Sequence, residues 1–205
     1  LILLLAVLSL APTLVMMMTS FTRIMVVLSF LRNAIGLQQS PPNAVMSGLA
    51  MFMTFFIMSP TLEKAYKEGL EPYIQEEISD EEAFNKTTDP FRIFMLTQVR
   101  EKDLEMFFTM AKVTPSTPSQ TPLKILIPAF MMSELKKAFE IGFLIFMPFL
   151  IIDMVVASIL MSMGMMMVPP TMIALPFKLI FFVLIDGWYM LVGSLIKGYG
   201  NVFIS

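Results

Sequence analysis

The distribution of charge along the chain constrains its fold more than any other feature of the sequence. Of thirty charged side chains among 205 residues, 14 basic and 16 acidic, residues 1–62 hold two, residues 63–112 hold nineteen and residues 141–205 hold four. Residues 1–22 and 33–62 carry no charge, and each stretch is long enough to cross about 30 Å of hydrocarbon as a helix. With 57% hydrophobic residues and a mean hydropathy of +0.77, the chain is predicted to associate with a membrane.

The sequence contains neither cysteine nor histidine. This excludes disulfides, thiolate metal sites and cysteine nucleophiles, and it removes the most common general base and the usual zinc and haem ligand. Glycine-rich phosphate-binding motifs are absent, and the net charge of −2 offers no basic surface for nucleic acid. We therefore expect a protein that is not an enzyme and that binds no cofactor, metal or nucleic acid.

The first predicted segment, residues 1–62, consists of apolar helices with a turn at residues 33–43. Polar residues and a double proline in this turn cannot continue a helix. Arg23 and Arg32 precede the turn, and the positive-inside bias assigns it to the cytoplasmic side. The insert that follows is then expected on the periplasmic side.

The second predicted segment, residues 63–122, is an acidic helical insert that ends in a proline-rich linker at residues 113–122. Three helix starts are indicated by capping or proline signals: Ser59-Pro60, Ser79 with Glu82, and Asp89-Pro90. Apolar side chains over residues 91–110 recur at helical spacing, which predicts one amphipathic helix with a buried face. The members of that face are Phe91, Met95, Val99, Met106 and Met110.

The third predicted segment, residues 123–205, is a hydrophobic helical hairpin with a methionine-rich bend at residues 164–171. Gly164 tolerates unusual backbone angles, and Pro169 and Pro170 terminate a helix. No strand-like alternation occurs in the sequence. The predicted fold class is therefore all-α, with long hydrophobic helical hairpins and a polar helical insert.

Methionines at the bend are unusual, because bends normally hold polar residues. Met165, Met166 and Met167 are consecutive in a chain that contains 22 methionines. They either replace leucine in ordinary packing or form a deformable apolar seal, since methionine is flexible and polarisable. Both interpretations are consistent with the sequence.

Isolated charges in the apolar segments are the other candidates for a mechanism. Asp153, Lys178 and Asp186 are expected to form structural ion pairs, contacts with other subunits or, less simply, a proton relay. Glu134 and Lys137 stand three residues apart and can pair on one helix. The same two residues are alternatively available for contacts with a partner.

Several motifs run through both apolar blocks and are long enough to be specific. They are residues 20–34, 38–43, 128–130, 133–135, 148–153, 165–170, 175–178 and 186–188. These segments closely resemble the FliP family, the export-gate proteins of flagellar type III secretion, which are related to a core component of virulence injectisomes.

The resemblance implies assembly with FliQ, FliR, FlhB and further copies of the same chain, pentameric in the family, into a closed ring-like complex. Unfolded flagellar proteins would enter through this complex, sealed by Met165 to Met167, and Glu134 would pair with a basic residue of a neighbour such as FliR. The resemblance also implies a removed signal peptide and a position in the bacterial inner membrane, largely on the periplasmic side. Energy would come from partner proteins and the proton motive force.

Two alternatives differ in class from an export gate. One is a small ion-coupled or proton-coupled transporter that uses Asp153, Lys178 and Asp186 as its relay. The other is a structural assembly factor without a pore. The large acidic insert and the methionine bend speak against a carrier, because a carrier needs neither.

Overall fold

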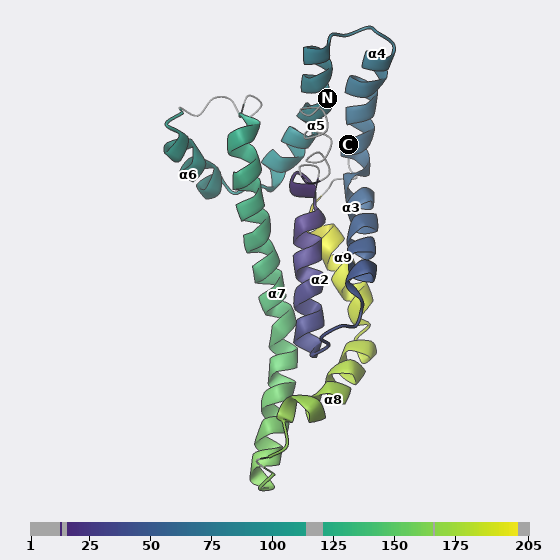
Figure 1. The fold of residues 1–205 in the computed structure, drawn as a ribbon. Helices are drawn as coiled ribbons and strands as arrows, with labels where there is room; N and C mark the ends of the chain where they lie inside the picture. The colour runs from purple at the N-terminus through teal and green to yellow at the C-terminus, as the bar shows by residue number, and fades with distance from the viewer. Residues whose placement is uncertain (1–12, 14–15, 114–120, 166, 201–205) are drawn as a thin grey trace, which may run out of the picture. The chain divides into compact units, whose positions relative to one another are not determined.

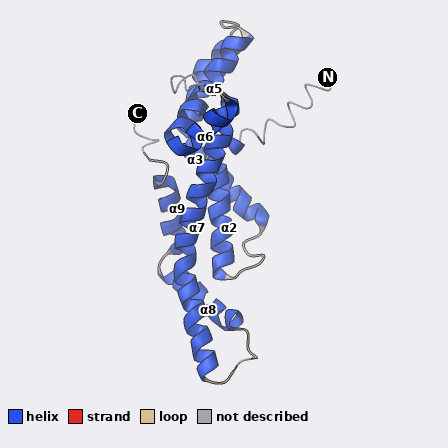
Figure 2. Ribbon diagram, turned by 90° about the vertical axis from the view of Figure 1, so that its left-hand side faces the viewer, coloured by secondary structure: helices blue, strands red, loops and turns tan. Residues whose placement is uncertain are grey.

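The computed structural model of the protein describes residues 13, 16–113, 121–165 and 167–200. This part of the chain is built from helices and contains no strand (Figures 1 and 2), which confirms the predicted all-α class. The elements are α2 (Phe21–Ile35), α3 (Asn43–Ala65), the π-helix η1 (Tyr66–Leu70), α4 (Glu71–Ile74), α5 (Asp80–Gln98), α6 (Glu101–Ala111), α7 (Leu123–Ser162), α8 (Pro170–Leu184) and α9 (Gly187–Lys197).

The helices form two compact units, each assembled from separate stretches of sequence. The first unit comprises the described residues up to 23 together with residues 51–136, and the second comprises residues 24–50 and 137–200. The helices α2, α3 and α7 each contribute residues to both units. The three segments distinguished by charge are a different division of the chain, and that division stays a prediction.

One of the three predicted helix starts is confirmed. Ser79 is the N-cap of α5, and its Oγ accepts a hydrogen bond of 3.4 Å from the backbone N–H of Glu82. The predicted start at Ser59-Pro60 is wrong, because α3 continues through Pro60 to Ala65. A proline inside a helix costs about 3 kcal/mol. Here the continued helix keeps an apolar face buried on both sides of Pro60, where Ile57, Thr61 and Ala65 are all buried.

The predicted start at Asp89-Pro90 is wrong for a similar reason, because α5 continues through Pro90, which is itself buried. The single amphipathic helix over residues 91–110 is also wrong. Val99 and Arg100 have extended backbone angles and separate α5 from α6. The two helices place their apolar residues differently, since Met95 is buried and Met110 is 70% exposed.

The turn between α2 and α3 is held by Arg32 in the last turn of α2. Its Nη1 donates hydrogen bonds to Asn43 Oδ1 at 2.6 Å and to the Pro41 carbonyl at 3.5 Å. The side chain thereby ties the end of one helix to the first residue of the next. Arg32 consequently has a structural role in the turn besides any influence on orientation in a membrane.

Aromatic contacts join α7, α8 and α9 in the second unit, where α8 turns back from the end of α7 (Figure 1). Phe149 of α7 contacts Phe181 of α8 edge to face, with ring centroids 6.0 Å apart. Phe182 contacts Trp188 of α9 in the same manner at 5.5 Å. Such contacts stabilise a pair of rings beyond the burial of their area.

Two helical stretches are long and apolar enough to cross a membrane, Asn43–Ile74 and Leu123–Ser162. A third span is available if α8 and α9, which are bent by 62° at their link, are taken together. These assignments rest on length and composition. They agree with the membrane association predicted from the uncharged stretches.

Candidate functional site

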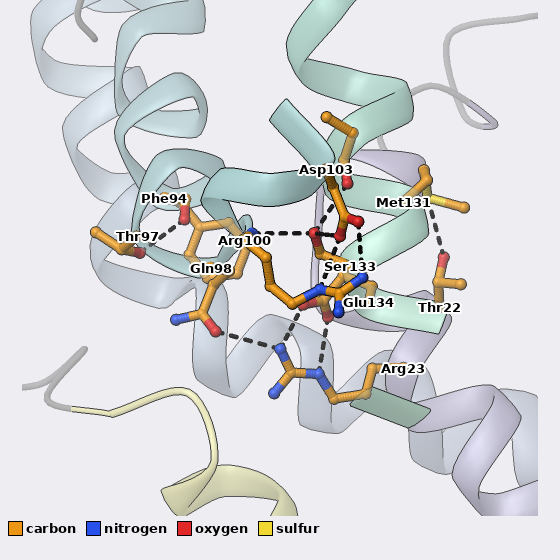
Figure 3. Close-up of polar contacts among 11 residues, drawn as sticks. Thr22, Arg23, Phe94, Thr97, Gln98, Arg100, Asp103, Met131, Ser133 and Glu134 are labelled. Atoms are coloured by element: carbon orange, nitrogen blue, oxygen red, sulfur yellow. Dashed lines mark hydrogen bonds and ion pairs between the residues drawn. The ribbon is translucent and has the colours of Figure 1, made fainter. Parts of the chain in front are cut away.

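A buried ion pair between Arg23 and Glu134 lies within the first unit (Figure 3). The side chains are 2% and 0% exposed. Arg23 Nε donates to Glu134 Oε2 at 2.9 Å, and Nη2 donates to Oε1 of the same carboxylate. This two-point geometry is the strong form of an arginine–carboxylate contact. The pair therefore joins the start of α2 to α7 inside an apolar environment.

Gln98, the last residue of α5, extends this pair to a third helix. Its Oε1 accepts a hydrogen bond of 3.2 Å from Arg23 Nη2, and the residue is only 8% exposed. A buried guanidinium needs acceptors for several of its five donors. The amide oxygen supplies one of them, so Arg23 holds α2, α5 and α7 together.

A second polar cluster lies beside the first and involves the residue that precedes Glu134. The Ser133 hydroxyl donates to Asp103 Oδ2 at 2.6 Å and accepts from the backbone N–H of Arg100 at 3.0 Å. Arg100 also holds both carboxylate oxygens of Asp103, with Nε at 2.8 Å and Nη2 at 2.7 Å. These contacts fix the break between α5 and α6, because they satisfy the backbone where the helix is interrupted.

The environment of Asp103 changes its ionisation. Burial disfavours the charged form and by itself raises the pKa of Asp103. The hydrogen bonds from Ser133 and Arg100, together with the positive charges of Arg100 and Lys136, outweigh this effect and lower the pKa below its ordinary value. Asp103 is therefore held as a carboxylate.

The partner of Glu134 was not identified from the sequence. The alternatives were Lys137 on the same helix or a basic residue of another subunit, and the structure pairs Glu134 with Arg23, 111 residues away in the chain. Arg23 was expected to mark the cytoplasmic side. In the folded chain its charge is neutralised by Glu134 inside the first unit, and the orientation of the chain in a membrane stays a prediction.

Asp153 and Lys178 are brought together in the second unit, from α7 and α8. Lys178 Nζ donates to Asp153 Oδ2 at 2.6 Å and to the Ala34 carbonyl of α2 at 3.1 Å. The lysine side chain is 6% exposed and the aspartate side chain is 30% exposed. Two helices of the C-terminal segment and the end of α2 are therefore tied by one ammonium group.

Asp186 is not part of this arrangement. It is exposed at the link between α8 and α9, has a left-handed backbone with a φ of 52°, and makes no ion pair within the described part of the chain. The three charges expected as possible relay members thus divide into one ion pair, between a buried lysine and a half-buried aspartate, and one separate surface residue. The transporter alternative has little support from this geometry.

The methionine-rich bend connects α7 and α8. The helix α7 ends at Ser162, Gly164 adopts a left-handed φ of 75°, and α8 begins at Pro170 directly after Pro169. Met165 is 44% exposed and Met167 is 98% exposed. Met166 lies outside the described residues. The bend therefore presents at least two methionine side chains that the chain itself does not cover.

No group of three or more acidic, histidine or cysteine side chains is placed to hold a metal ion in the described part of the chain. The buried charges are Arg23, Glu134, Asp103 and Lys178. All four take part in ion pairs that join helices or fix a helix break.

Comparisons with known proteins assign the chain to a family. The FliP family is matched over residues 4–195. The flagellar biosynthetic protein FliP of Caulobacter vibrioides is 56% identical over 197 residues, covering 96% of this chain and 74% of the relative. The FliP proteins of Bacillus subtilis and Aquifex aeolicus are each 54% identical, covering 97% and 95% of this chain and 90% and 83% of the relatives.

The buried pair of the first unit leads to a stability prediction. We expect Glu134→Ala to lower the free energy of unfolding by about 3 to 5 kcal/mol, because the Arg23 guanidinium stays buried and loses the carboxylate that neutralises it. Unfolding of the full chain in mild detergent, followed by circular dichroism, measures this change. The double exchange Arg23→Glu with Glu134→Arg should recover part of the loss.

Glu63→Ala is the matched control for this experiment. Glu63 pairs with Lys67 at 2.6 Å, but both side chains are more than 60% exposed. We expect no measurable change, because water replaces the lost contact. Equal losses for the two alanine variants would show that burial of the Arg23–Glu134 pair does not determine its contribution.

Asp103 provides a pH-dependent prediction. We expect Asp103→Asn to be less stable than the unchanged chain at pH 7 by about 1 to 3 kcal/mol, because Arg100 and Ser133 lose a charged acceptor. A lowered pKa stabilises the folded chain above the unfolded-state value of about 3.9, and this contribution disappears as the pH falls through the folded-state pKa. The difference between the two proteins should therefore shrink below about pH 4. A difference that stays constant from neutral to strongly acidic pH would contradict the assignment.

Proposed function

The chain belongs to the FliP family, and we propose on that basis that it is a core subunit of the flagellar protein export gate. The observation that carries this proposal is identity above 50% over nearly the whole chain to proteins named flagellar biosynthetic protein FliP. In this role it forms part of the entrance through which unfolded flagellar proteins cross the inner membrane. The spans and the apolar composition fit a membrane-embedded component.

We propose FliQ, FliR, FlhB and further copies of this chain as its partners. The support is the family resemblance together with an apolar surface larger than one soluble chain would expose. Large hydrophobic side chains are exposed along the second half of α7 and along α8. Examples are Phe143, Leu144, Met154, Val183 and Leu184, each more than 60% exposed. Such a surface requires lipid, partners or both.

The protein acts as a conduit and not as a catalyst in this proposal. Its buried charges hold helices in place, and energy for transport comes from other components of the apparatus. The inner membrane is the proposed location, with the acidic insert on the periplasmic side. This orientation rests on the family resemblance and on the positive-inside bias of Arg23 and Arg32, which precede the turn between α2 and α3.

The methionine bend is proposed as the seal of the entrance. A gate for unfolded chains must exclude ions at rest and yet accept many different side chains. Rigid branched side chains suit one of these states, whereas unbranched methionine can adapt to both. The exposure of Met165 and Met167 supports this role, since an apolar constriction requires side chains that project from their own subunit.

A genetic experiment tests the proposed function. Deletion of the gene for this chain from its own organism should abolish secretion of flagellin and motility, and reintroduction of the gene should restore both. Secreted flagellin is measured in the culture supernatant, with a cytoplasmic protein as the lysis control. Normal flagellin secretion in the deletion strain would contradict the proposal.

The seal is tested separately by replacing Met165, Met166 and Met167 with alanine. We expect the complex to assemble but the membrane to admit ions and small dyes, because the shorter side chains no longer close the constriction. Dye uptake in cells measures the leak, and a native gel verifies assembly.

The matched control for the seal replaces three other exposed methionines that flank the bend, Met161, Met163 and Met172. This variant loses the same number of methionines and should stay impermeable. Unchanged permeability of the first variant in an intact complex, or equal leaks in both variants, would refute the seal.

A further inference from the structure

Arg32 in the second unit is a cation without a neutralising partner among the described residues. Its guanidinium donates to the Asn43 side chain and the Pro41 carbonyl, which are both uncharged acceptors. Its Nε is buried and donates to no acceptor in the described part of the chain. A buried donor without an acceptor is costly, and a positive charge beside apolar groups favours an anion.

An apolar cavity of 390 Å³ lies directly beside this guanidinium. Arg32 is the one charged residue among the described residues that line the cavity, and most of the others are aliphatic or aromatic. The walls include Leu31, Ile35, Val45, Leu49, Leu179 and Trp188. The volume is within the range of small-molecule sites, about 300–1,000 Å³. The combination of one cation with an apolar cavity matches a ligand that has an anionic head and a hydrocarbon tail.

The position of the cavity indicates where such a ligand comes from. Asn43, which binds Arg32, is the first residue of the candidate membrane span Asn43–Ile74. Trp188 lines the same cavity and is 42% exposed, and tryptophan is enriched at the boundary between hydrocarbon and water. The guanidinium thus lies beside the first residue of a candidate span, and the ends of a membrane span lie near the phospholipid head groups.

We propose that this cavity binds an anionic phospholipid of the bilayer, with the phosphate at the Arg32 guanidinium and one acyl chain in the cavity. Arginine suits this role because its planar fork contacts two phosphate oxygens at once. A head group with a net negative charge neutralises the positive charge of the Arg32 guanidinium. The site is independent of the export function proposed above, since it rests on the cavity and the cation alone.

Lipid retention by the purified full chain tests this site. The protein is delipidated in mild detergent, exposed to an equal mixture of dioleoylphosphatidylglycerol and dioleoylphosphatidylcholine, and examined by native mass spectrometry. Because the two lipids share their acyl chains, a preference reports the head group. We expect the unchanged chain to retain the anionic lipid about tenfold over the zwitterionic one.

Two variants separate the head-group contact from the turn that Arg32 stabilises. Arg32→Gln should abolish the preference, whereas Arg32→Lys should keep much of it because the charge remains. Asn43→Ala weakens the same turn without removing the charge, and it should retain the preference. Circular dichroism verifies the helical content of each variant.

Two further variants form a matched pair that tests the acyl-chain cavity. Val45 lines the cavity and is 58% exposed, whereas Val155 is 53% exposed and lines an apolar cavity of 410 Å³ that has no charged residue. Val45→Trp fills the site and leaves Arg32 intact, so lipid retention should fall about tenfold, and Val155→Trp should change nothing.

Several results would overturn the proposal. Equal retention of both lipids by the unchanged chain would mean that the cavity accepts any acyl chain. Retention of neither lipid would mean that a partner helix or a second copy covers this face. An unchanged preference in Arg32→Gln, or equal effects of Val45→Trp and Val155→Trp, would place the lipid elsewhere.

Discussion

The burial of charge in an apolar chain is the constraint on which the rest of the first unit depends. Arg23 and Glu134 are almost completely inaccessible to water, and an unpaired ion in such a place would be strongly unfavourable. The two must therefore meet, and with them the start of α2 and the N-terminal third of α7. Gln98 brings the end of α5 to the same guanidinium. Apolar side chains alone are compatible with many arrangements of neighbouring helices, whereas a two-point ion pair is compatible with very few arrangements.

The same principle operates at the neighbouring cluster and in the second unit. Asp103, in the first turn of α6, anchors this helix to α7 through Ser133, which is adjacent in sequence to Glu134. In the second unit, Lys178 links α8 to both α7 and α2 through Asp153 and a backbone carbonyl. Each cluster gives its helices a defined register in surroundings where leucine, methionine and phenylalanine are nearly interchangeable. Buried polar contacts of this kind specify a structure more than they stabilise it.

The apolar surface that remains after folding connects this architecture with the proposed role. A chain that exposes phenylalanine, leucine and methionine along α7 and α8 is unsuited to water as a single molecule. Lipid and partner helices satisfy the same surface, and composition does not distinguish between them. Individual side chains indicate at particular places whether lipid or protein covers the surface. We propose an anionic head group at Arg32, which has no neutralising partner among the described residues, and contact with changing side chains at the exposed methionines of the bend.

The sequence alone determined the helical class, the membrane character, the Ser79 cap of α5 and the family, because these depend on composition or on residues within one helical turn of one another. The tertiary structure decided features that local signals cannot predict. The helices α3 and α5 continue through Pro60 and Pro90 because the helix faces before and after each proline are buried. It also decided the break between α5 and α6 at Val99 and Arg100, which depends on the Ser133 hydroxyl of α7. The partner of Glu134 was hidden for the same physical reason. Two charges separated by 111 residues show no periodicity that links them, and only the folded chain brings them within hydrogen-bonding distance.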